Sequence, residues 1–190
     1  MQEFDDSKFN FTKIKKEECL LQFDPSSEAE GAYIEDGEPL RSSSNAVLVN
    51  VSPIEYGHIL LIPKYMKKLP QLVSPATLYT ALQMAVASAN RYFRIGFNSL
   101  GAYGSVNHLH FQAYYMYHAF PIERSPTRTL FEGACIVSEV LDYPVKAICV
   151  EAGSSIRDLA DLVGKVCEFL QVGLTEIITI KFLLAESCMH

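Results

Sequence analysis

Two histidines and a glutamine alternate with apolar residues in the segment Val-Asn-His-Leu-His-Phe-Gln at 106–112. On a β-strand successive side chains point to opposite faces. His108, His110 and Gln112 would then line one face, while the apolar residues between them pack on the other. The chain has 5 histidines in 190 residues, so a chance pair at this spacing is improbable. We expect a strand at residues 106–116 to carry the functional site.

Three kinds of chemistry could use two histidines on one strand face. A His-x-His pair can chelate zinc or iron, with His58 as a third ligand, although no carboxylate lies near the motif. Partly buried histidines could instead be structural, held by backbone groups. In the third interpretation a neutral imidazole attacks the phosphorus of a phosphoanhydride, and a hydrogen bond to its other nitrogen fixes the tautomer. His, Gln, Asn and loop N–H groups would then donate to the phosphoryl oxygens.

The segments around the motif predict how it is positioned. Uninterrupted apolar runs indicate buried strands. Ser74 and Pro75 predict the start of a helix, with serine as N-cap and proline at the first helical position. A glycine-containing loop at 99–105 precedes the histidines. The resulting order is β-β-α-β-β, with strands at 46–51, 58–63, 93–98 and 106–116.

Shorter elements flank this core. Strands are expected before it at 8–13 and 19–23, followed by a long mobile loop at 24–45 that is rich in Ser, Glu and Gly. After it we expect strands at 135–141 and 145–150, a helix capped by Ser155, and a strand at 177–184.

The expected fold class is therefore α+β, an antiparallel sheet with helices. Its catalytic core would occupy residues 1–128, a partial second β-β-α-β unit residues 129–171, and a divergent tail residues 172–190.

Composition excludes several classes of partner. Apolar residues make up 49% of the chain, and 16 Lys and Arg against 22 Asp and Glu give a net charge of −6. That charge argues against a broad nucleic-acid-binding face, and no apolar run approaches the roughly 20 residues that span a bilayer. The 5 cysteines lack Cys-x-x-Cys spacing and indicate reduced thiols. We expect a cytoplasmic protein, with the nucleus as a second location, that binds neither nucleic acid nor membrane.

Residues within 50–64 and 98–112 resemble the histidine-triad superfamily. Gln112 in place of a third histidine resembles its nucleotidyl-transferase branch, of the galactose-1-phosphate uridylyltransferase type. Four segments, at 50–58, 92–101, 107–115 and 120–127, resemble the GDP-hexose phosphorylases more closely still. These comprise the GDP-L-galactose phosphorylases of ascorbate synthesis in plants and algae and the animal GDP-D-glucose phosphorylases. It runs from about Lys8 to Gln171, so we expect a chain truncated at both ends relative to that family.

The resemblance implies a reaction and roles for the motif. GDP-L-galactose and phosphate would give L-galactose 1-phosphate and GDP through a guanylyl-histidine intermediate on His110. Gln112 would hydrogen-bond the transferred phosphate, and its amide, which cannot act as a general acid, suits transfer to phosphate over transfer to water. His108 and His58 would orient the site. GDP-D-glucose phosphorylase and a truncated, inactive form that binds guanine nucleotide are the alternatives, and Gln112 argues against a hydrolase.

The resemblance also implies substrate contacts outside the histidines. Asn50 would contact the ribose hydroxyls, Asn98 and Ser105 the phosphates, and Asn107 belongs to the same substrate-binding set. From the residues alone, the first two asparagines could also be turn-forming. No metal or other cofactor is expected, the partners would be the GDP-hexose and inorganic phosphate, and a homodimer is a further expectation.

Overall fold

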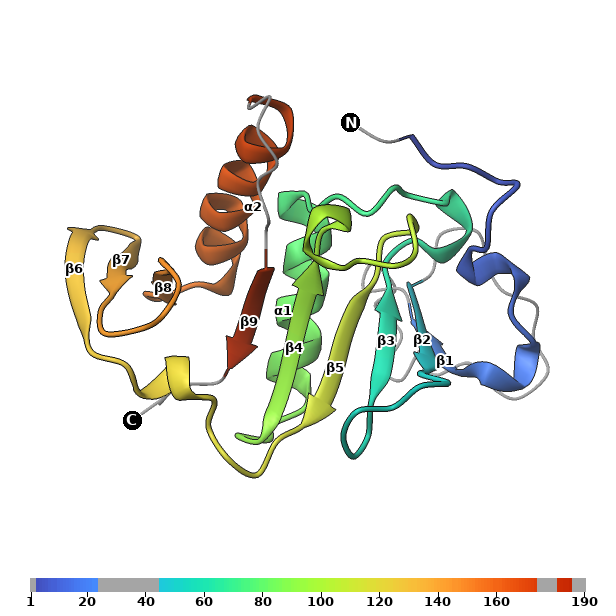
Figure 1. Ribbon diagram of the computed structural model, residues 1–190, viewed down its shortest axis with the longest axis horizontal. Coiled ribbons are helices and arrows are strands. Elements are labelled where there is room, and N and C mark those ends of the chain that lie inside the picture. The colour runs from blue at the N-terminus through green and yellow to red at the C-terminus, as the bar shows by residue number, and fades with distance from the viewer. Residues whose placement is uncertain (1–2, 24–44, 174–180, 186–190) are drawn as a thin grey trace.

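The computed structural model of the chain describes residues 3–23, 45–173 and 181–185, and it has a mixed α and β fold (Figure 1). The predicted α+β class is confirmed. The helices are α1 (Pro75–Ala87) and α2 (Ile156–Gly173). The strands are β1 (Cys19–Phe23), β2 (Asn45–Val49), β3 (Ile59–Ile62), β4 (Phe93–Asn98), β5 (Phe111–Tyr115), β6 (Thr127–Glu132), β7 (Cys135–Val140), β8 (Ile148–Ala152) and β9 (Lys181–Ala185).

Two antiparallel sheets organise these residues. The larger has the order β1-β2-β3-β5-β4-β9, and the smaller has the order β6-β7-β8. Figure 1 shows α1 behind β4 and β5, with α2 packed beside it. The β-β-α-β-β order of the core is therefore as predicted, from β2 to β5.

The strands β2 and β3 are buried on both faces, as their uninterrupted apolar runs predict. Val47 and Leu61 belong to the larger core cluster, which packs against α1. Leu48 and Leu60 point the other way, into a second cluster that includes Phe11 of the N-terminal segment. Because each sheet face has its own apolar cover, the register of these strands is strongly specified.

The helix α1 begins where the sequence predicts. Ser74 accepts a hydrogen bond from the Thr77 backbone, the Thr77 hydroxyl accepts one from the Ser74 N–H in return, and Pro75 is the first helical residue. This reciprocal capping box satisfies two backbone donors that the first turn would otherwise leave unpaired. Ser155 likewise caps α2 by accepting from the Arg157 N–H at 3.1 Å.

The second half differs from the prediction in three respects. The strand β6 was not predicted, because all of its residues are exposed and give no alternating apolar pattern. The last strand, β9, pairs with β4 of the larger sheet and not with the β6–β8 sheet. The strand β8 also begins later than predicted. The domain boundaries after 128 and 171 stay predictions. Asn45, the last residue of the loop predicted at 24–45, begins β2. The rest of that loop lies outside the described residues, as does the start of the strand predicted at 177–184.

The strand predicted at 8–13 is wrong. Phe11–Lys13 form a single 3-10 turn, because the Asn10 side chain caps it by accepting from the Thr12 N–H at 3.1 Å. The ring of Phe11 is buried against the histidine motif. The segment before β1 therefore packs over the histidine motif and adds no strand to the sheet.

A buried ion pair joins β4 to the segment that leads into β6. The Arg94 guanidinium makes two hydrogen bonds to the Glu123 carboxylate, at 3.0 and 2.8 Å, and their side chains are 7% and 18% exposed. Such bidentate geometry is the strong form of this contact. In the part of the chain described here, no helix is long and apolar enough to cross a membrane.

Candidate active site

The histidine motif lies mostly before β5 and only partly within it. The strand begins at Phe111, five residues later than predicted, because residues 107–109 pair with the segment after Lys68 and not with a neighbouring strand. The predicted alternation nevertheless persists. Leu109 and Phe111 pack in the larger core cluster, and the ring of His110 packs on the opposite side against Phe11.

His110 is held in one tautomer by its own chain. Its Nδ1 lies 2.8 Å from the backbone carbonyl oxygen of His108, and a carbonyl can only accept, so Nδ1 carries the proton. Nε2 then has a free lone pair. Burial lowers the pKa of His110, with the His108 carbonyl acting in the opposite direction, so the ring stays neutral near pH 7. A neutral imidazole in this tautomer is the form that can attack an electrophile.

His108 occupies a different environment, fully buried among aromatic rings. Its Nδ1 accepts a hydrogen bond from the Phe11 backbone N–H at 3.2 Å, and its ring lies 5.5 to 6.2 Å from the rings of Phe4, Phe11 and Tyr65. Its Nε2 has no hydrogen-bond partner among the described residues. Burial lowers the pKa of His108 to about 4. The Tyr65 backbone acts in the opposite direction, although it forms no hydrogen bond with Nε2. His108 contacts the His110 ring through its backbone carbonyl, and its role in orienting the site stays a prediction.

The pairing of β2, β3 and β5 brings three polar side chains together. Leu60 pairs with Gln112 across β3 and β5, and the Asn50 N–H donates to the His58 carbonyl where β2 meets β3. The His58 Nδ1 accepts from the Ile54 N–H at 3.0 Å, so its proton lies on Nε2.

The proton on His58 orients the side-chain amide of Gln112. Nε2 donates to the Gln112 side-chain oxygen at 3.1 Å, which leaves the Gln112 NH2 group as a donor. Asn50 Nδ2 lies 2.9 Å from the same Nε2, but neither atom can accept while the ring proton points to Gln112. The Asn50 oxygen accepts from the Ser52 N–H at 2.9 Å, so the NH2 group is the part of this amide that is available to a ligand. Burial lowers the pKa of His58, and the hydrogen bond to Gln112 opposes this shift.

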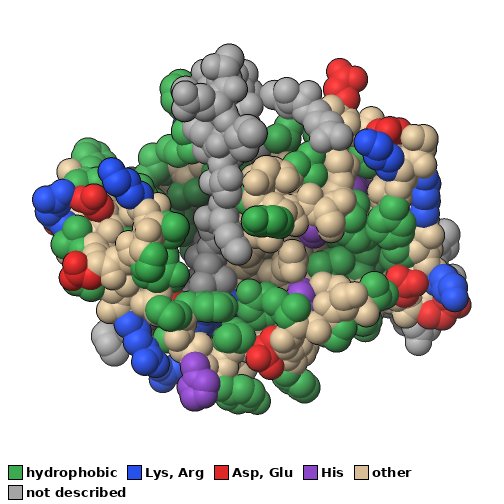
Figure 2. All heavy atoms as spheres, viewed as in Figure 1, with side chains coloured by type: hydrophobic (Ala, Val, Ile, Leu, Met, Phe, Trp, Pro, Cys, Tyr) green, Lys and Arg blue, Asp and Glu red, His purple; other side chains and the backbone are tan. Residues whose placement is uncertain are grey.

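These side chains line a cavity of about 320 Å³, a volume within the usual range of small-molecule sites. Its polar wall contains His58, His110, Gln112 and Asn50, and the exposed Ser105 lies at its edge. Its apolar wall includes Phe9 and Phe11 of the N-terminal segment, with Ile14, Leu48 and Ile54. On the face shown in Figure 2, only small areas of histidine are visible over β3 and β5, because hydrophobic side chains and backbone surround them.

The structure does not bring all the predicted site residues to this cavity. His108, Asn98 and Asn107 are not among its lining residues. The Asn107 amide joins distant segments, because it accepts from the Gln71 N–H at 2.9 Å and donates to the Glu3 carbonyl at 2.8 Å. The proposed substrate contacts of these residues stay predictions. No group of three His, Cys, Asp or Glu side chains in the described ranges could hold a metal ion.

The sequence did not identify the residues that hold the motif in place. Gln71 follows a proline in a segment without periodicity, yet its side chain binds the backbone of His110. The N-terminal segment was read as a strand, yet it supplies Phe11 to both histidines. Close-packed loops leave no periodic pattern, so no sequence signal identified either contact.

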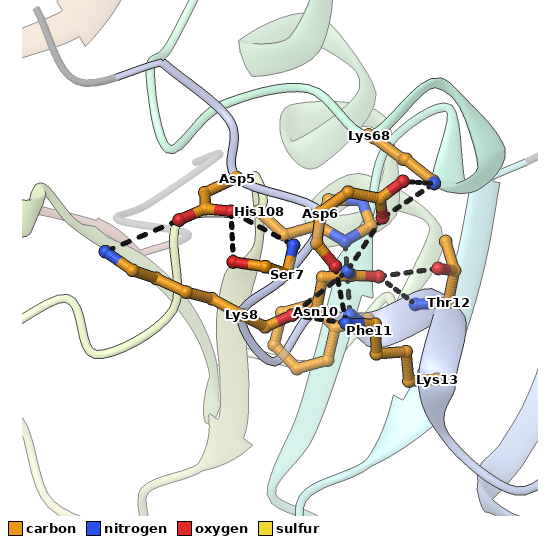
Figure 3. A network of polar contacts seen from close by, with 10 residues as sticks. All are labelled: Asp5, Asp6, Ser7, Lys8, Asn10, Phe11, Thr12, Lys13, Lys68 and His108. Atoms are coloured by element: carbon orange, nitrogen blue, oxygen red, sulfur yellow. Dashed lines mark hydrogen bonds and ion pairs between the residues drawn. The ribbon is translucent and has the colours of Figure 1, made fainter.

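Figure 3 shows how the N-terminal segment is attached over His108. The Asp6 carboxylate makes two hydrogen bonds to the Lys68 ammonium, at 2.8 and 2.6 Å. The Tyr65 hydroxyl donates to the Phe11 carbonyl at 2.6 Å. Both anchors come from residues just after β3, and His58 directly precedes the same strand, so the cover over the histidines is attached next to the strand that positions His58.

Comparison with known proteins places the chain in a family. A model described as "GDPGP1-like, N-terminal domain" matches residues 1–114, and "GDPGP1-like, C-terminal domain" matches residues 121–175. GDP-L-galactose phosphorylase 1 of Arabidopsis thaliana is 46% identical over 90% of this chain and 39% of its own length. GDP-D-glucose phosphorylase 1 of Homo sapiens is 34% identical over 87% of this chain and 41% of its own.

The chain spans about two fifths of the length of these relatives. Among solved structures, the yeast Ap4A phosphorylase Apa2 in complex with Ap4A aligns with a TM-score of 0.48 and 14% identity, over 75% of this chain and 54% of that one. The family model for the N-terminal domain covers more than half of the chain, including every lining residue of the cavity. The chain belongs to the GDPGP1-like family.

Proposed function

We propose that this chain transfers a guanylyl group from a GDP-hexose to inorganic phosphate through a covalent intermediate on His110. The observation that carries the proposal is the Nδ1–H bond of His110 to the His108 carbonyl, because it leaves Nε2 unprotonated in a residue that lines the cavity. An unprotonated imidazole nitrogen is a nucleophile for phosphorus.

The proposed reaction is two displacements at one phosphorus atom. His110 Nε2 attacks the α-phosphorus, an Nε2–P bond forms, and the bond to the bridging oxygen breaks, so that hexose 1-phosphate leaves with the electron pair. Inorganic phosphate then attacks the same phosphorus, the Nε2–P bond breaks, and GDP is released. The Nδ1–H remains on the ring throughout and donates to the His108 carbonyl, which stabilises positive charge on the phosphorylated imidazole.

The hydrogen bonds around His58 support roles for two amides. Because the Gln112 oxygen accepts from His58, the Gln112 NH2 group is oriented as a donor for the transferred phosphoryl oxygens. The Asn50 NH2 group, which cannot donate to the protonated Nε2 of His58, suits a ribose hydroxyl. No general acid is required, because the leaving group is a phosphate with a low pKa.

For the sugar we propose L-galactose, since identity to the plant GDP-L-galactose phosphorylase exceeds identity to the human GDP-D-glucose phosphorylase. The test is to incubate the purified chain with either GDP-hexose, with and without phosphate, and to measure GDP. We expect GDP formation that requires phosphate, is faster with GDP-L-galactose, and is lost in His110→Ala. Release of GMP without phosphate would instead indicate a hydrolase.

A second candidate follows from the chain's length relative to its relatives. If catalysis needs parts that only the longer relatives contain, this chain binds guanine nucleotide without turnover. Calorimetry with GDP separates the two functions: binding without any GDP formation supports the second, and the absence of both binding and turnover contradicts both.

A further inference from the structure

Gln71 is a buried polar residue that the proposed reaction does not use. Its side chain is 1% exposed, and in the sequence it precedes α1 and lies 39 residues before His110. A buried side-chain amide is costly unless its donors and acceptor are paired. All three of its hydrogen-bonding groups are paired, and two of the three bonds go to one residue.

That residue is His110. The Gln71 side-chain oxygen accepts from the His110 backbone N–H at 2.9 Å, and its Nε2 donates to the His110 backbone carbonyl at 3.1 Å. The second Nε2 hydrogen goes to the Asn98 carbonyl at the end of β4, at 3.0 Å. One amide therefore pairs both backbone groups of His110 and joins them to the neighbouring strand.

The position of His110 explains why such pairing matters. Regular strand pairing of β5 with β3 extends from Ala113 to Phe111 and includes no residue before it. His110 lies one residue beyond that pairing, where no strand holds its backbone. The Nδ1–H bond to the His108 carbonyl spans only two residues, so its geometry depends on the backbone conformation between them.

We propose that Gln71 is a positioning residue for the nucleophile. By holding the peptide groups of His110, it keeps the ring in the Nδ1–H tautomer with Nε2 free. This inference rests on the proposed function only in assigning His110 the role of nucleophile; the effect on the ring exists whether or not the chain turns over.

A purely structural role for Gln71 predicts a different result. It would lower the fraction of folded protein and leave each folded molecule with a normal His110 ring. A positioning role lowers kcat per folded molecule while KM changes little, because misplacement of the reacting group by about 1 Å can cost about 100-fold in rate.

The test compares Gln71→Met, which keeps length and volume but loses the amide, with Thr80→Val. Thr80 is a buried residue of α1 whose hydroxyl bonds the Ala76 carbonyl, away from the cavity. For Gln71→Met we expect kcat to fall roughly 10- to 100-fold with KM within about 3-fold. Thr80→Val should keep the kcat of the unaltered chain per folded molecule.

Nitrogen-15 NMR of the imidazole rings provides a readout without activity. In the unaltered chain the two His110 ring nitrogens should have widely separated shifts, as expected for one protonated and one unprotonated nitrogen, and His110→Ala assigns them. In Gln71→Met the two shifts should move toward each other as the tautomers interconvert. If Gln71→Met does not fold, Gln71→Asn, which withdraws the amide by one methylene, replaces it.

The outcomes separate this inference from the proposed function. Unchanged His110 shifts in a folded Gln71 variant overturn it, as does an unchanged kcat or a fall in kcat that Thr80→Val shows equally. If the unaltered chain has no turnover but its His110 shifts are separated and converge in Gln71→Met, the proposed function fails while the positioning role stands.

Discussion

Replacing Tyr65 by phenylalanine tests how much its buried hydrogen bond contributes to holding the N-terminal segment over the histidines. The Tyr65 ring is 1% exposed, and its hydroxyl donates to the Phe11 carbonyl at 2.6 Å. Burial raises the pKa of this phenol to about 12, so the hydroxyl is a donor at every ordinary pH. Tyr65→Phe removes this donor and leaves the ring in place, so the Phe11 carbonyl keeps only the longer hydrogen bond from the Ile14 N–H, at 3.4 Å.

The magnitude follows from the loss of one hydrogen bond to a carbonyl that keeps a second donor. A hydrogen bond of this kind contributes about 0.5 to 1.5 kcal/mol to stability. At about 2 to 4 °C per kcal/mol for a chain of this size, the melting temperature should fall by about 1 to 6 °C. The Phe11 amide, which donates to the His108 ring, should also exchange its hydrogen faster, because its segment is less firmly attached.

The assay is urea unfolding of Tyr65→Phe beside Tyr117→Phe. The second variant makes the same chemical change at a residue that is 68% exposed, where an effect within about 0.5 kcal/mol is expected. If both variants unfold at the same urea concentration, and Phe11 exchanges at the same rate in both, the Tyr65 hydroxyl does not hold the segment and the reasoning is refuted.

Three further predictions concern stability. Arg94→Met leaves the Glu123 carboxylate buried without its partner and should cost about 3 to 5 kcal/mol in urea unfolding, whereas Arg94→Met with Glu123→Leu should recover most of it. Burial lowers the pKa of His108 from 6.5 to about 4 in the folded chain, so as the pH falls the unfolded chain binds this proton first. The free energy of unfolding should therefore decrease between pH 6.5 and pH 4, by about 3 kcal/mol for this site. Urea unfolding at about pH 7.5 and about pH 4.5 should therefore show a smaller difference in His108→Phe than in the unaltered chain. Gly104→Ala would place a Cβ 2.8 Å from two backbone oxygens and should lower the unfolding free energy by about 1 to 3 kcal/mol, and an unchanged stability would contradict this.

The central strands and α1 could be predicted because their signals are local. The apolar runs of β2 and β3 and the Ser-Pro start of α1 each identify an element without knowledge of its neighbours. The predicted alternation of His110 and Gln112 with apolar residues is also present before the first residue of β5, because Leu109 and Phe111 are buried in the core.

The differences between the two histidines could not be predicted. In sequence His108 and His110 are equivalent members of one motif. The N-terminal segment, nearly 100 residues away, covers His108 with aromatic rings, while His110 lines the cavity. Gln71 reaches His110 across 39 residues, and β9 pairs with β4 across more than 80. Such long-range contacts depend on tertiary packing, which local patterns do not encode.

Whether His110 is the nucleophile can be read from the intact mass of the chain after incubation with GDP-L-galactose in the absence of phosphate, followed by peptide mapping. We expect one added guanylyl group on His110, which later addition of phosphate removes as GDP, and no adduct in His110→Ala. A chain that releases GDP with phosphate yet never carries the adduct, or an adduct that persists in His110→Ala, would contradict His110 as the nucleophile.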